Sequence, residues 1–232
     1  MNFNEGAFIY INKPYGMSSF GALAHIRYVV SKRMHVKRVK MGHAGTLDPL
    51  ATGVLILCTG KKTKQIEQLQ LDTKEYTATL QLGATTPSYD REHTVDMTYP
   101  TRHITRELID SVLPQFLGDV MQVPPAYSAV HVDGERAYKL RRQSHEVEKQ
   151  MQAKPVRIDE IEVLDFDAQT MQLQLRVVCG KGTYIRSLAR DIGRALGSGA
   201  FLTALRRTRV GDIRVEDCVD FDHVKEWLEG VE

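Results

Sequence analysis

The sequence predicts an α+β fold in which a largely antiparallel sheet is flanked by helices. Expected strands and helices follow one another in an irregular mixture, which argues against regular βαβ units and a parallel sheet. The segments IDEIEVLDF and MQLQLRVVC are joined by a turn near Asp167–Thr170, so we expect them to pair as antiparallel strands. A hydrophobic content of 42% and a charged content of 26% are those of a globular chain.

The N-terminal part of the chain contains both expected strands and expected helices. AFIYIN (7–12) is typical of a short strand, and KPYGMSS then leads into a helix that Ser18 or Ser19 caps and that runs to about Arg33. VLILC (54–58) is a continuous apolar run of strand length, as in a strand covered on both faces. KKTKQIEQLQ predicts a helix, and the alternating segment EYTATLQLG (75–83) predicts a strand.

The rest of the chain holds four expected helices beside the paired strands. Residues 84–101 are typical of a loop, and ITRELIDSVLPQF predicts a helix that stops near Pro114. Residues 124–150 are expected to leave the main fold as a short strand, a turn at 133–134 and a basic helix. GTYIRSLARDIGRALG (182–197) predicts a helix with an apolar stripe, and the acidic tail from Val215 is expected to end in a helix.

The positive charge is concentrated in two stretches although the net charge is only +2. Residues 6–47 carry seven Lys or Arg and no Asp or Glu, and residues 181–214 carry eight basic residues against two acidic ones. Because Lys and Arg displace the counterions of a polyanion, such stretches favour a nucleic acid as partner over a merely solvated face.

Several classes of protein are disfavoured by what the sequence lacks. No apolar run approaches the ~20 residues that a membrane span needs, and the first residues lack the features of a signal peptide. The three cysteines, Cys58, Cys179 and Cys218, are far apart and form no Cys-x-x-Cys pair, so we expect reduced thiols. The sequence therefore predicts a cytoplasmic protein with no membrane association.

The segment GHAGTLDPLATG (42–53) places a single carboxylate, Asp48, in a loop of glycines and small residues. Glycine permits unusual backbone angles and Pro49 fixes its own, so the loop is expected to hold Asp48 in one geometry. A carboxylate held in this way can be a nucleophile, a general base, a metal ligand or the cap of a turn. No Asp, Glu or His cluster surrounds it, which disfavours a metal, and the Lys-Ser/Thr ending of a P-loop is missing.

GHAGTLDPLATGVLILCTGKKTK closely resembles the signature of bacterial tRNA pseudouridine synthases of the TruB family, which modify the T-loop uridine at tRNA position 55. Further segments resemble the other motifs of that family in the same order along the chain. They are INKPYGMSS (11–19), KEYTATLQLG (74–83), VPPAYSAVHVDGERAY (123–138), GKGTYIRSLARDIG (180–193) and GAFLTALRRTRVG (199–211). The resemblance thus extends nearly from end to end.

The resemblance implies a pseudouridine synthase fold, with one long mixed, largely antiparallel sheet flanked by helices and an active-site cleft crossing it. It implies a single catalytic domain over residues 1–232, in which residues 124–152 form a thumb-like insertion over the RNA. Residues 215–232 would be a short C-terminal tail, so we expect a short form without a full C-terminal RNA-binding domain. The implied reaction isomerises a uridine with base flipping and uses no cofactor and no metal.

The resemblance also implies the site residues. Asp48 would be the nucleophile, attacking either the base or the sugar, and Arg186 would pair with it. Tyr76 would stack on the uracil and could move a proton. The substrate-binding residues would be His43, Tyr184, Leu205, Lys13 and Asp90, with His43 filling the space of the flipped base and Lys13 supporting the pocket beneath Tyr76. Contacts to the RNA backbone would come from Lys64, Arg141, Arg142 and Arg207.

Besides the short C-terminal tail, one loop departs from the family pattern, and two other functions remain open. The loop TTPSYDREH keeps Asp90 but lacks an earlier Asp and a later Gly of the family motif. The expected partner is the T stem-loop of tRNA, bound by a monomer without an obligate protein partner. The alternatives are a non-catalytic RNA-binding or tRNA-folding module on the same fold, and a synthase for a different RNA, as in the guide-dependent relatives.

Overall fold

The computed structural model describes all residues except 1, 128–130, 133–134, 137–150 and 231–232. The described residues form two compact units. Unit 1 contains Met1–Tyr76 and Leu205–Glu232, and unit 2 contains Thr77–Ala204. Two strands, β4 (Lys74–Leu82) and β12 (Ala200–Val210), contribute residues to both units. The single catalytic domain expected from the sequence stays a prediction.

Unit 1 is built on a mixed sheet with the strand order β14-β1-β3-β12-β4. Strand β1 (Phe8–Lys13) pairs antiparallel with β3 (Ala51–Thr59) and parallel with β14 (Val219–Asp220), and β3 pairs parallel with β12. Two short strands, β2 (Met41–His43) and β13 (Ile213–Arg214), pair antiparallel with β3 and β12. The parallel pair β3–β12 joins two segments that lie far apart in the sequence.

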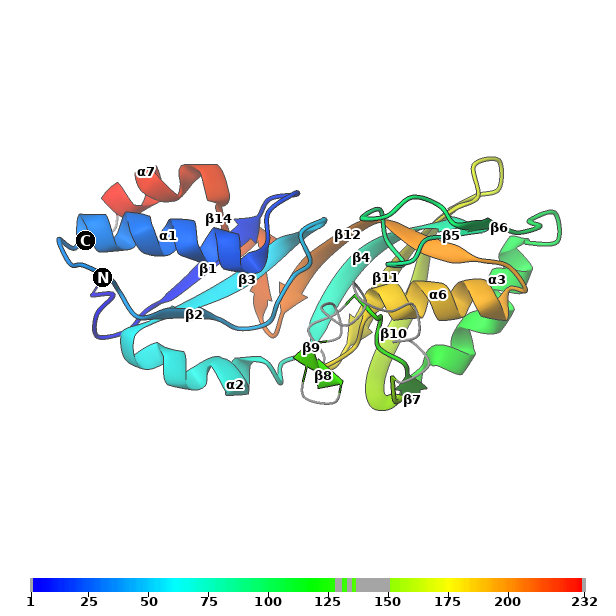
Figure 1. Cartoon of the computed structure of the whole chain (residues 1–232), viewed down its shortest axis with the longest axis horizontal. Coiled ribbons are helices and arrows are strands. Elements are labelled where there is room, and N and C mark those ends of the chain that lie inside the picture. The colour runs from blue at the N-terminus through cyan, green and yellow to red at the C-terminus, as the bar shows by residue number, and fades with distance from the viewer. Residues whose placement is uncertain (1, 128–130, 133–134, 137–150, 231–232) are drawn as a thin grey trace. The chain divides into compact units, whose positions relative to one another are not determined.

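Helices cover both faces of this sheet. Helix α1 (Ser19–Arg33) lies beside α7 (Val224–Glu229), as Figure 1 shows. The hydroxyl of Ser18 accepts a hydrogen bond from Gly21 N at 3.0 Å and caps α1, so of the two expected serines it is Ser18 that forms the cap. Short turns of 3-10 helix, η1 (Gly60–Gln65), η3 (Val215–Asp217) and η4 (Phe221–His223), and helix α2 (Ile66–Leu69) complete the unit.

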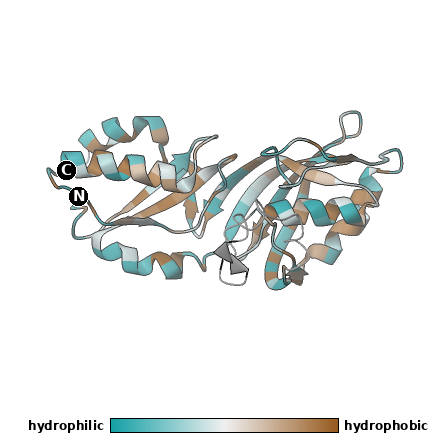
Figure 2. Ribbon diagram, viewed as in Figure 1, coloured by the Kyte–Doolittle hydropathy of each residue, from teal (hydrophilic) through white to brown (hydrophobic). Residues whose placement is uncertain are grey.

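Strand β3 is buried on both faces, as its apolar run predicted. Figure 2 colours the hydrophobic residues of the strands brown. Leu55 and Leu57 pack with residues of α1 and α7 in one core cluster. Val54, Ile56 and Cys58 point to the other face and pack in a second cluster, against which Ile66 and Leu69 lie. Because side chains alternate between the two faces of a strand, a core on each face requires a continuous apolar segment.

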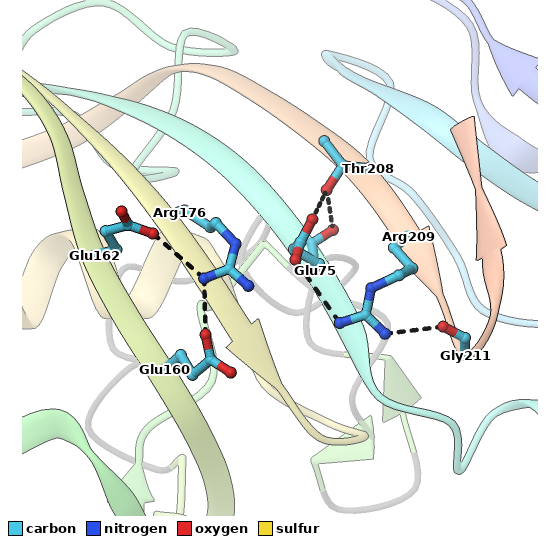
Figure 3. Close-up of polar contacts among 7 residues, drawn as sticks. All are labelled: Glu75, Glu160, Glu162, Arg176, Thr208, Arg209 and Gly211. Atoms are coloured by element: carbon cyan, nitrogen blue, oxygen red, sulfur yellow. Dashed lines mark hydrogen bonds and ion pairs between the residues drawn. The ribbon is translucent and has the colours of Figure 1, made fainter. Parts of the chain in front are cut away.

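Unit 2 contains a sheet with the strand order β12-β4-β11-β10-β7. The long strand β10 (Lys154–Asp167) pairs antiparallel with β11 (Gln172–Cys179), which confirms the expected hairpin, and with β7 (Gly118–Gln122). In this hairpin the Arg176 guanidinium lies 2.7 Å from Glu160 and 3.4 Å from Glu162 (Figure 3). Helix α6 (Ile185–Ala195) confirms the helix expected in this part of the chain.

The remaining elements of unit 2 are short. Helix α3 (Arg106–Val112) continues into the 3-10 turn η2 (Leu113–Phe116), where the sequence predicted the helix to stop. Strands β5 (Ala84–Thr85) and β6 (Met97–Thr98) pair within the segment expected to be a loop. Strands β8 (His131–Val132) and β9 (Glu135–Arg136) pair on either side of the expected turn at 133–134, which lies outside the described residues, as does the expected basic helix.

The fold class predicted from the sequence is confirmed as a mixed, mostly antiparallel sheet with flanking helices. Among the described residues, no helix is long and apolar enough to cross a membrane.

Candidate active site

The Asp48 loop, residues 44–50, connects the antiparallel strands β2 and β3 in unit 1. Gly45 has a φ of +99°, a conformation that glycine adopts at little cost. The Asp48 carbonyl accepts a hydrogen bond from Ala51 N at 3.1 Å, which starts β3 directly behind the loop. Asp48 itself is half-buried, so its carboxylate is positioned at the end of a rigid strand but is not sealed in the core.

Ser19 holds the residue before Asp48 in place. Its hydroxyl donates to Leu47 O at 2.9 Å, and Leu47 N donates to the same hydroxyl at 2.8 Å. Ser19 is buried and is the first residue of α1, so the N-terminal end of this helix is bonded to the loop. The carboxylate-bearing loop is therefore tied to a helix as well as to a strand.

Lys13 holds the residue after Asp48. Its ammonium is fully buried and donates to Pro14 O at 2.8 Å, to Met17 O at 2.6 Å and to Pro49 O at 3.3 Å. Burial lowers the pKa of Lys13 to about 8, with a further decrease from the Arg207 charge, while attraction to Asp48 opposes both. Lys13 thus joins the INKP turn to the Asp48 loop.

Arg207 occupies a position that differs from the expected contact with the RNA backbone. Its side chain is buried, with 2% of the residue exposed, and its guanidinium donates to Val54 O at 2.8 Å and to Gly45 O at 3.2 Å. The parallel pairing of β12 with β3 sets Arg207 opposite Gly53 and turns the guanidinium toward the backbone of the loop. In this structure Arg207 positions the Asp48 loop and does not face solvent, where a phosphate would bind.

His43 lies on β2 and is half-buried. Burial lowers its pKa below the ordinary value, and the Arg207 charge lowers it further, against the opposing effect of a hydrogen bond with the Gly45 backbone. Its Nδ1 is buried and has no hydrogen-bond partner among the residues that the structure describes. The imidazole beside the Asp48 loop is therefore kept in its neutral form near pH 7.

Tyr76 and Leu205 lie on the strands that complete unit 1. Tyr76 is 9% exposed and lies on the buried face of β4, and Leu205 is half-buried on β12 opposite Ala51. Figure 3 shows one contact that fixes β12 to β4, in which the Thr208 hydroxyl donates a hydrogen bond to Glu75 Oε1 at 2.9 Å. The parallel pairing of β12 with β3 brings Leu205 next to Ala51, the first residue of the strand that follows Asp48. Lys64 is exposed on η1, where an RNA phosphate could reach it.

Arg186 and Asp90 are brought together in unit 2. Arg186 is the second residue of α6, is 4% exposed, and lies 3.7 Å from the Asp90 carboxylate. Its guanidinium also donates to Ser88 O at 3.3 Å and to Tyr127 O at 3.0 Å. Asp90 in turn accepts from the Ser88 hydroxyl at 2.6 Å and from Glu92 N at 2.9 Å. Asp90 therefore orders the loop that carries Ser88 and faces the buried guanidinium.

Tyr184 lies immediately before α6, and its backbone is clamped by a buried glutamine. Gln122 donates to Tyr184 O at 3.2 Å and accepts from Tyr184 N at 2.8 Å. The backbone is thereby held at a residue that the family resemblance assigns to substrate binding. The two other basic residues assigned to RNA contacts, Arg141 and Arg142, lie outside the described residues.

The sequence did not identify the groups that position these side chains. Ser19 was expected only as a possible cap of α1, and no role was assigned to Gln122 or Ser88. Their roles arise from contacts with residues distant in the sequence, which only the folded chain reveals. Within the described part of the chain, no three His, Cys, Asp or Glu side chains gather as a metal site.

Comparison with solved structures defines the class of protein. A chain in the crystal structure of a Cbf5-Nop10-Gar1 complex matches with a TM-score of 0.70 and 29% identity, over 99% of this chain. A chain in an H/ACA RNP bound to a substrate RNA containing 2′-deoxyuridine matches with a TM-score of 0.66 and 27% identity. This chain spans only 58% and 57% of those two chains. The fold is that of the pseudouridine synthases.

Sequence comparison then defines the family. Residues 32–185 match the model of the TruB family pseudouridylate synthase N-terminal domain, and residues 186–230 match that of the tRNA pseudouridylate synthase B C-terminal domain. The tRNA pseudouridine synthase B of Bacteroides thetaiotaomicron is 61% identical over 99% of this chain and 95% of the relative. That of Mycobacterium leprae is 44% identical, but this chain covers 68% of its length. The chain belongs to the TruB family of pseudouridylate synthases and is an enzyme.

Proposed function

We propose that this enzyme converts the T-loop uridine of tRNA, at position 55, to pseudouridine, with Asp48 as the nucleophile. In this isomerisation the bond between C1′ and N1 of the uracil breaks, the base rotates, and a bond forms between C1′ and C5. The proton on C5 leaves and N1 carries a proton in the product, so atoms and charge balance without a cofactor. Attack of Asp48 on the base or on the sugar is compatible with this outcome.

The observation that carries the proposal is the way the Asp48 loop is held. The loop is bonded at Leu47 by Ser19, at Pro49 by Lys13, and at Gly45 by Arg207. Two of these three residues are buried cations, and the Lys13 ammonium attracts the Asp48 carboxylate. A carboxylate that is held rigidly and beside positive charge is suited to nucleophilic attack, because little reorganisation is needed at the moment of reaction. A pure binding protein has no need of such a group.

Tyr76 and Arg186 complete the proposed chemistry. Tyr76 lies on the buried face of β4, where a phenol can stack on uracil and accept or deliver a proton. Arg186 is the proposed partner of the Asp48 carboxylate, as the family resemblance implies. Burial of its guanidinium with ordered acceptors supports that role, since a buried cation keeps a fixed orientation when several acceptors hold it.

Base flipping is the second part of the proposal. A stacked loop uridine must leave its place before Asp48 can reach it, at a cost of a few kcal/mol. We assign His43 to fill the vacated space, because a neutral imidazole beside the loop can stack on neighbouring bases without attracting a phosphate. Leu205 and Tyr184 are assigned to the uracil pocket, and Asp90 to ordering the loop beside Arg186.

The remaining features of the proposed enzyme follow from its substrate. Since tRNA is the substrate, we place the enzyme in the cytoplasm. It acts as a monomer on the T stem-loop without a protein partner. The thumb over residues 124–152 and its Arg141 and Arg142 are proposed to grip the RNA.

The proposal is tested by tritium release from RNA whose uridines carry tritium at C5. Formation of the bond between C1′ and C5 expels that label into water, and an RNA with cytidine in place of the target uridine serves as the matched control. We expect release approaching one equivalent of target uridine from the T stem-loop and from whole tRNA, and none above background from the control. Tight RNA binding without release from either RNA would instead establish the non-catalytic alternative.

A further inference from the structure

Apart from Lys13 and Arg207, unit 1 contains a second group of cationic side chains, which the proposed chemistry does not use. The segment that precedes β2 lies against the start of η1, because Gly60 N donates to Lys40 O at 2.9 Å. Both segments carry exposed basic side chains. We call this group the basic surface; its members are Lys37, Arg38, Lys40, Lys61 and Lys64.

The basic surface lies at the opposite end of β3 from the Asp48 loop. The loop immediately precedes Ala51, where β3 begins, and η1 immediately follows Thr59, where β3 ends. The β2–β3 pairing sets Met41 opposite Thr59, so Lys40 lies at this same end. Nine residues of strand at about 3.3 Å each separate the two places by roughly 25–30 Å.

The charge of this surface is not compensated by its own elements. Residues 6–47 contain no Asp or Glu, and none of the five side chains forms an ion pair within the part of the chain that the structure describes. The acidic residues close in sequence or structure are Glu5, whose carbonyl accepts from Lys61 N, and Glu67 on α2. Five cations against two carboxylates leave an excess of positive charge that favours a polyanion.

We propose that the basic surface binds the phosphates of an RNA helix that continues past the T stem-loop. This inference rests on the proposed function, which places the target uridine at Asp48. At a rise of about 3 Å per base pair in an RNA helix, a span of 25–30 Å corresponds to roughly eight to ten stacked pairs. A short stem-loop bound at Asp48 ends before it reaches the basic surface, whereas the longer stacked helix of a whole tRNA can reach it.

The test compares stem-loops that share one loop sequence and differ only in the length of the stem. The variant Lys37→Gln, Arg38→Gln, Lys61→Gln removes three charges from the basic surface. A control variant removes three exposed charges elsewhere, through Arg102→Gln, Lys154→Gln and Lys225→Gln. Dissociation constants are measured over a range of salt concentrations for a short stem, for a stem of about a dozen pairs, and for whole tRNA.

For the unsubstituted enzyme, we expect affinity to rise by at least about tenfold once the stem passes roughly eight pairs. The variant should lose this gain and should show a salt slope reduced by about two to three on the long stem, because each lost phosphate contact removes close to one unit. The control variant should keep the gain. A gain that persists in the variant, or a loss of equal size on the short stem, overturns the proposal.

The result is distinguishable from failure of the proposed function. Tritium release from the short stem-loop should proceed at the same rate in the unsubstituted enzyme and in the variant, because that RNA does not reach the substituted residues. Absence of release in the unsubstituted enzyme would remove the proposed function, whereas normal release without any dependence on stem length would remove only this inference. The basic surface would be assigned to a membrane instead if two results were found together. Anionic vesicles would compete with the RNA for the unsubstituted enzyme but not for the variant, and the length of the stem would have no effect.

Discussion

Replacement of Arg207 by methionine tests whether this buried guanidinium positions the Asp48 loop. Methionine has a similar reach and fills much of the same volume, so the substitution leaves little cavity and removes chiefly the charge and the donors. The carbonyls of Val54 and Gly45 then lose the donors that lie at 2.8 and 3.2 Å. Val54 is completely buried, so water cannot replace the lost donor there.

The size of the effect follows from these two acceptors. A buried polar group left without its partner costs about 1–3 kcal/mol, and two of them set an upper range near 6 kcal/mol. Removal of the guanidinium also relieves its repulsion of the nearby Lys13 ammonium, which offsets part of that loss. We therefore expect the free energy of unfolding to fall by about 2–4 kcal/mol. The turnover rate should fall more than the affinity for RNA, since the loop and not the phosphate contacts is disturbed.

Two measurements separate positioning from a merely structural contribution. The Arg207 charge lowers the pKa of His43, so that pKa, followed by NMR titration, should rise in Arg207→Met. In Arg207→Lys the charge is kept and the two-carbonyl geometry is lost, so the pKa of His43 should stay close to that of the unsubstituted enzyme while turnover still falls. An unchanged pKa of His43 in Arg207→Met, together with a stability loss below about 1 kcal/mol, would refute the reasoning.

Three further predictions follow from the contacts of the site. Burial lowers the pKa of Lys13 from 10.5 to about 8. The unfolded chain therefore binds this proton more tightly than the folded chain does. As a result, the free energy of unfolding should rise by up to about 3 kcal/mol between pH 8 and 10.5. In Lys13→Met this rise should vanish, and a profile that parallels the unsubstituted enzyme would contradict the burial of an ammonium there. Gly53 has a φ of +102°, and an added Cβ would lie 2.1 Å from Arg207 O, so Gly53→Ala should destabilise the fold by more than about 3 kcal/mol in denaturant unfolding. Gly16→Ala is the control, because Gly16 has a φ of +80° and an added Cβ there would have no atom within 4 Å. It should lower the free energy of unfolding by only about 1 kcal/mol, the cost of the backbone conformation. Equal losses at the two positions would count against the close approach of Gly53 to Arg207 O. Asp90→Asn keeps the shape of the side chain and removes the charge that faces Arg186. We therefore expect the free energy of unfolding to fall by about 2 kcal/mol and the turnover rate to decrease. Unaltered turnover would show that Asp90 does not order the site.

Much of the frame around the site could be predicted because it depends on local patterns. The apolar run of β3 predicted a strand buried on both faces, and the glycines and proline around Asp48 predicted a fixed loop. The serine pair before α1 predicted its start, since a hydroxyl at that position satisfies a free backbone N–H. In each case the residues that decide the structure are neighbours in the sequence.

Arg207 shows why the rest could not be predicted in the same way. Basic side chains are seldom buried, so an arginine in the run LRRTR favoured a contact with RNA over a contact with the core. Its burial depends on the parallel pairing of β12 with β3, which sets Arg207 opposite Gly53 across a long separation in sequence. The pairing was not evident from the residues of either strand alone. The same holds for Ser19, whose bond to Leu47 requires the folded contact between helix and loop.

The most direct test of the central claim is tritium release by Asp48→Asn, measured with the T stem-loop and compared with the unsubstituted enzyme. The amide keeps the size of the side chain and cannot supply a nucleophilic carboxylate, so we predict that release is abolished. The dissociation constant for the same RNA should stay within about threefold, because the phosphate contacts come from residues that are left intact. Turnover within about tenfold of the unsubstituted enzyme would contradict the account and remove Asp48 from the reaction.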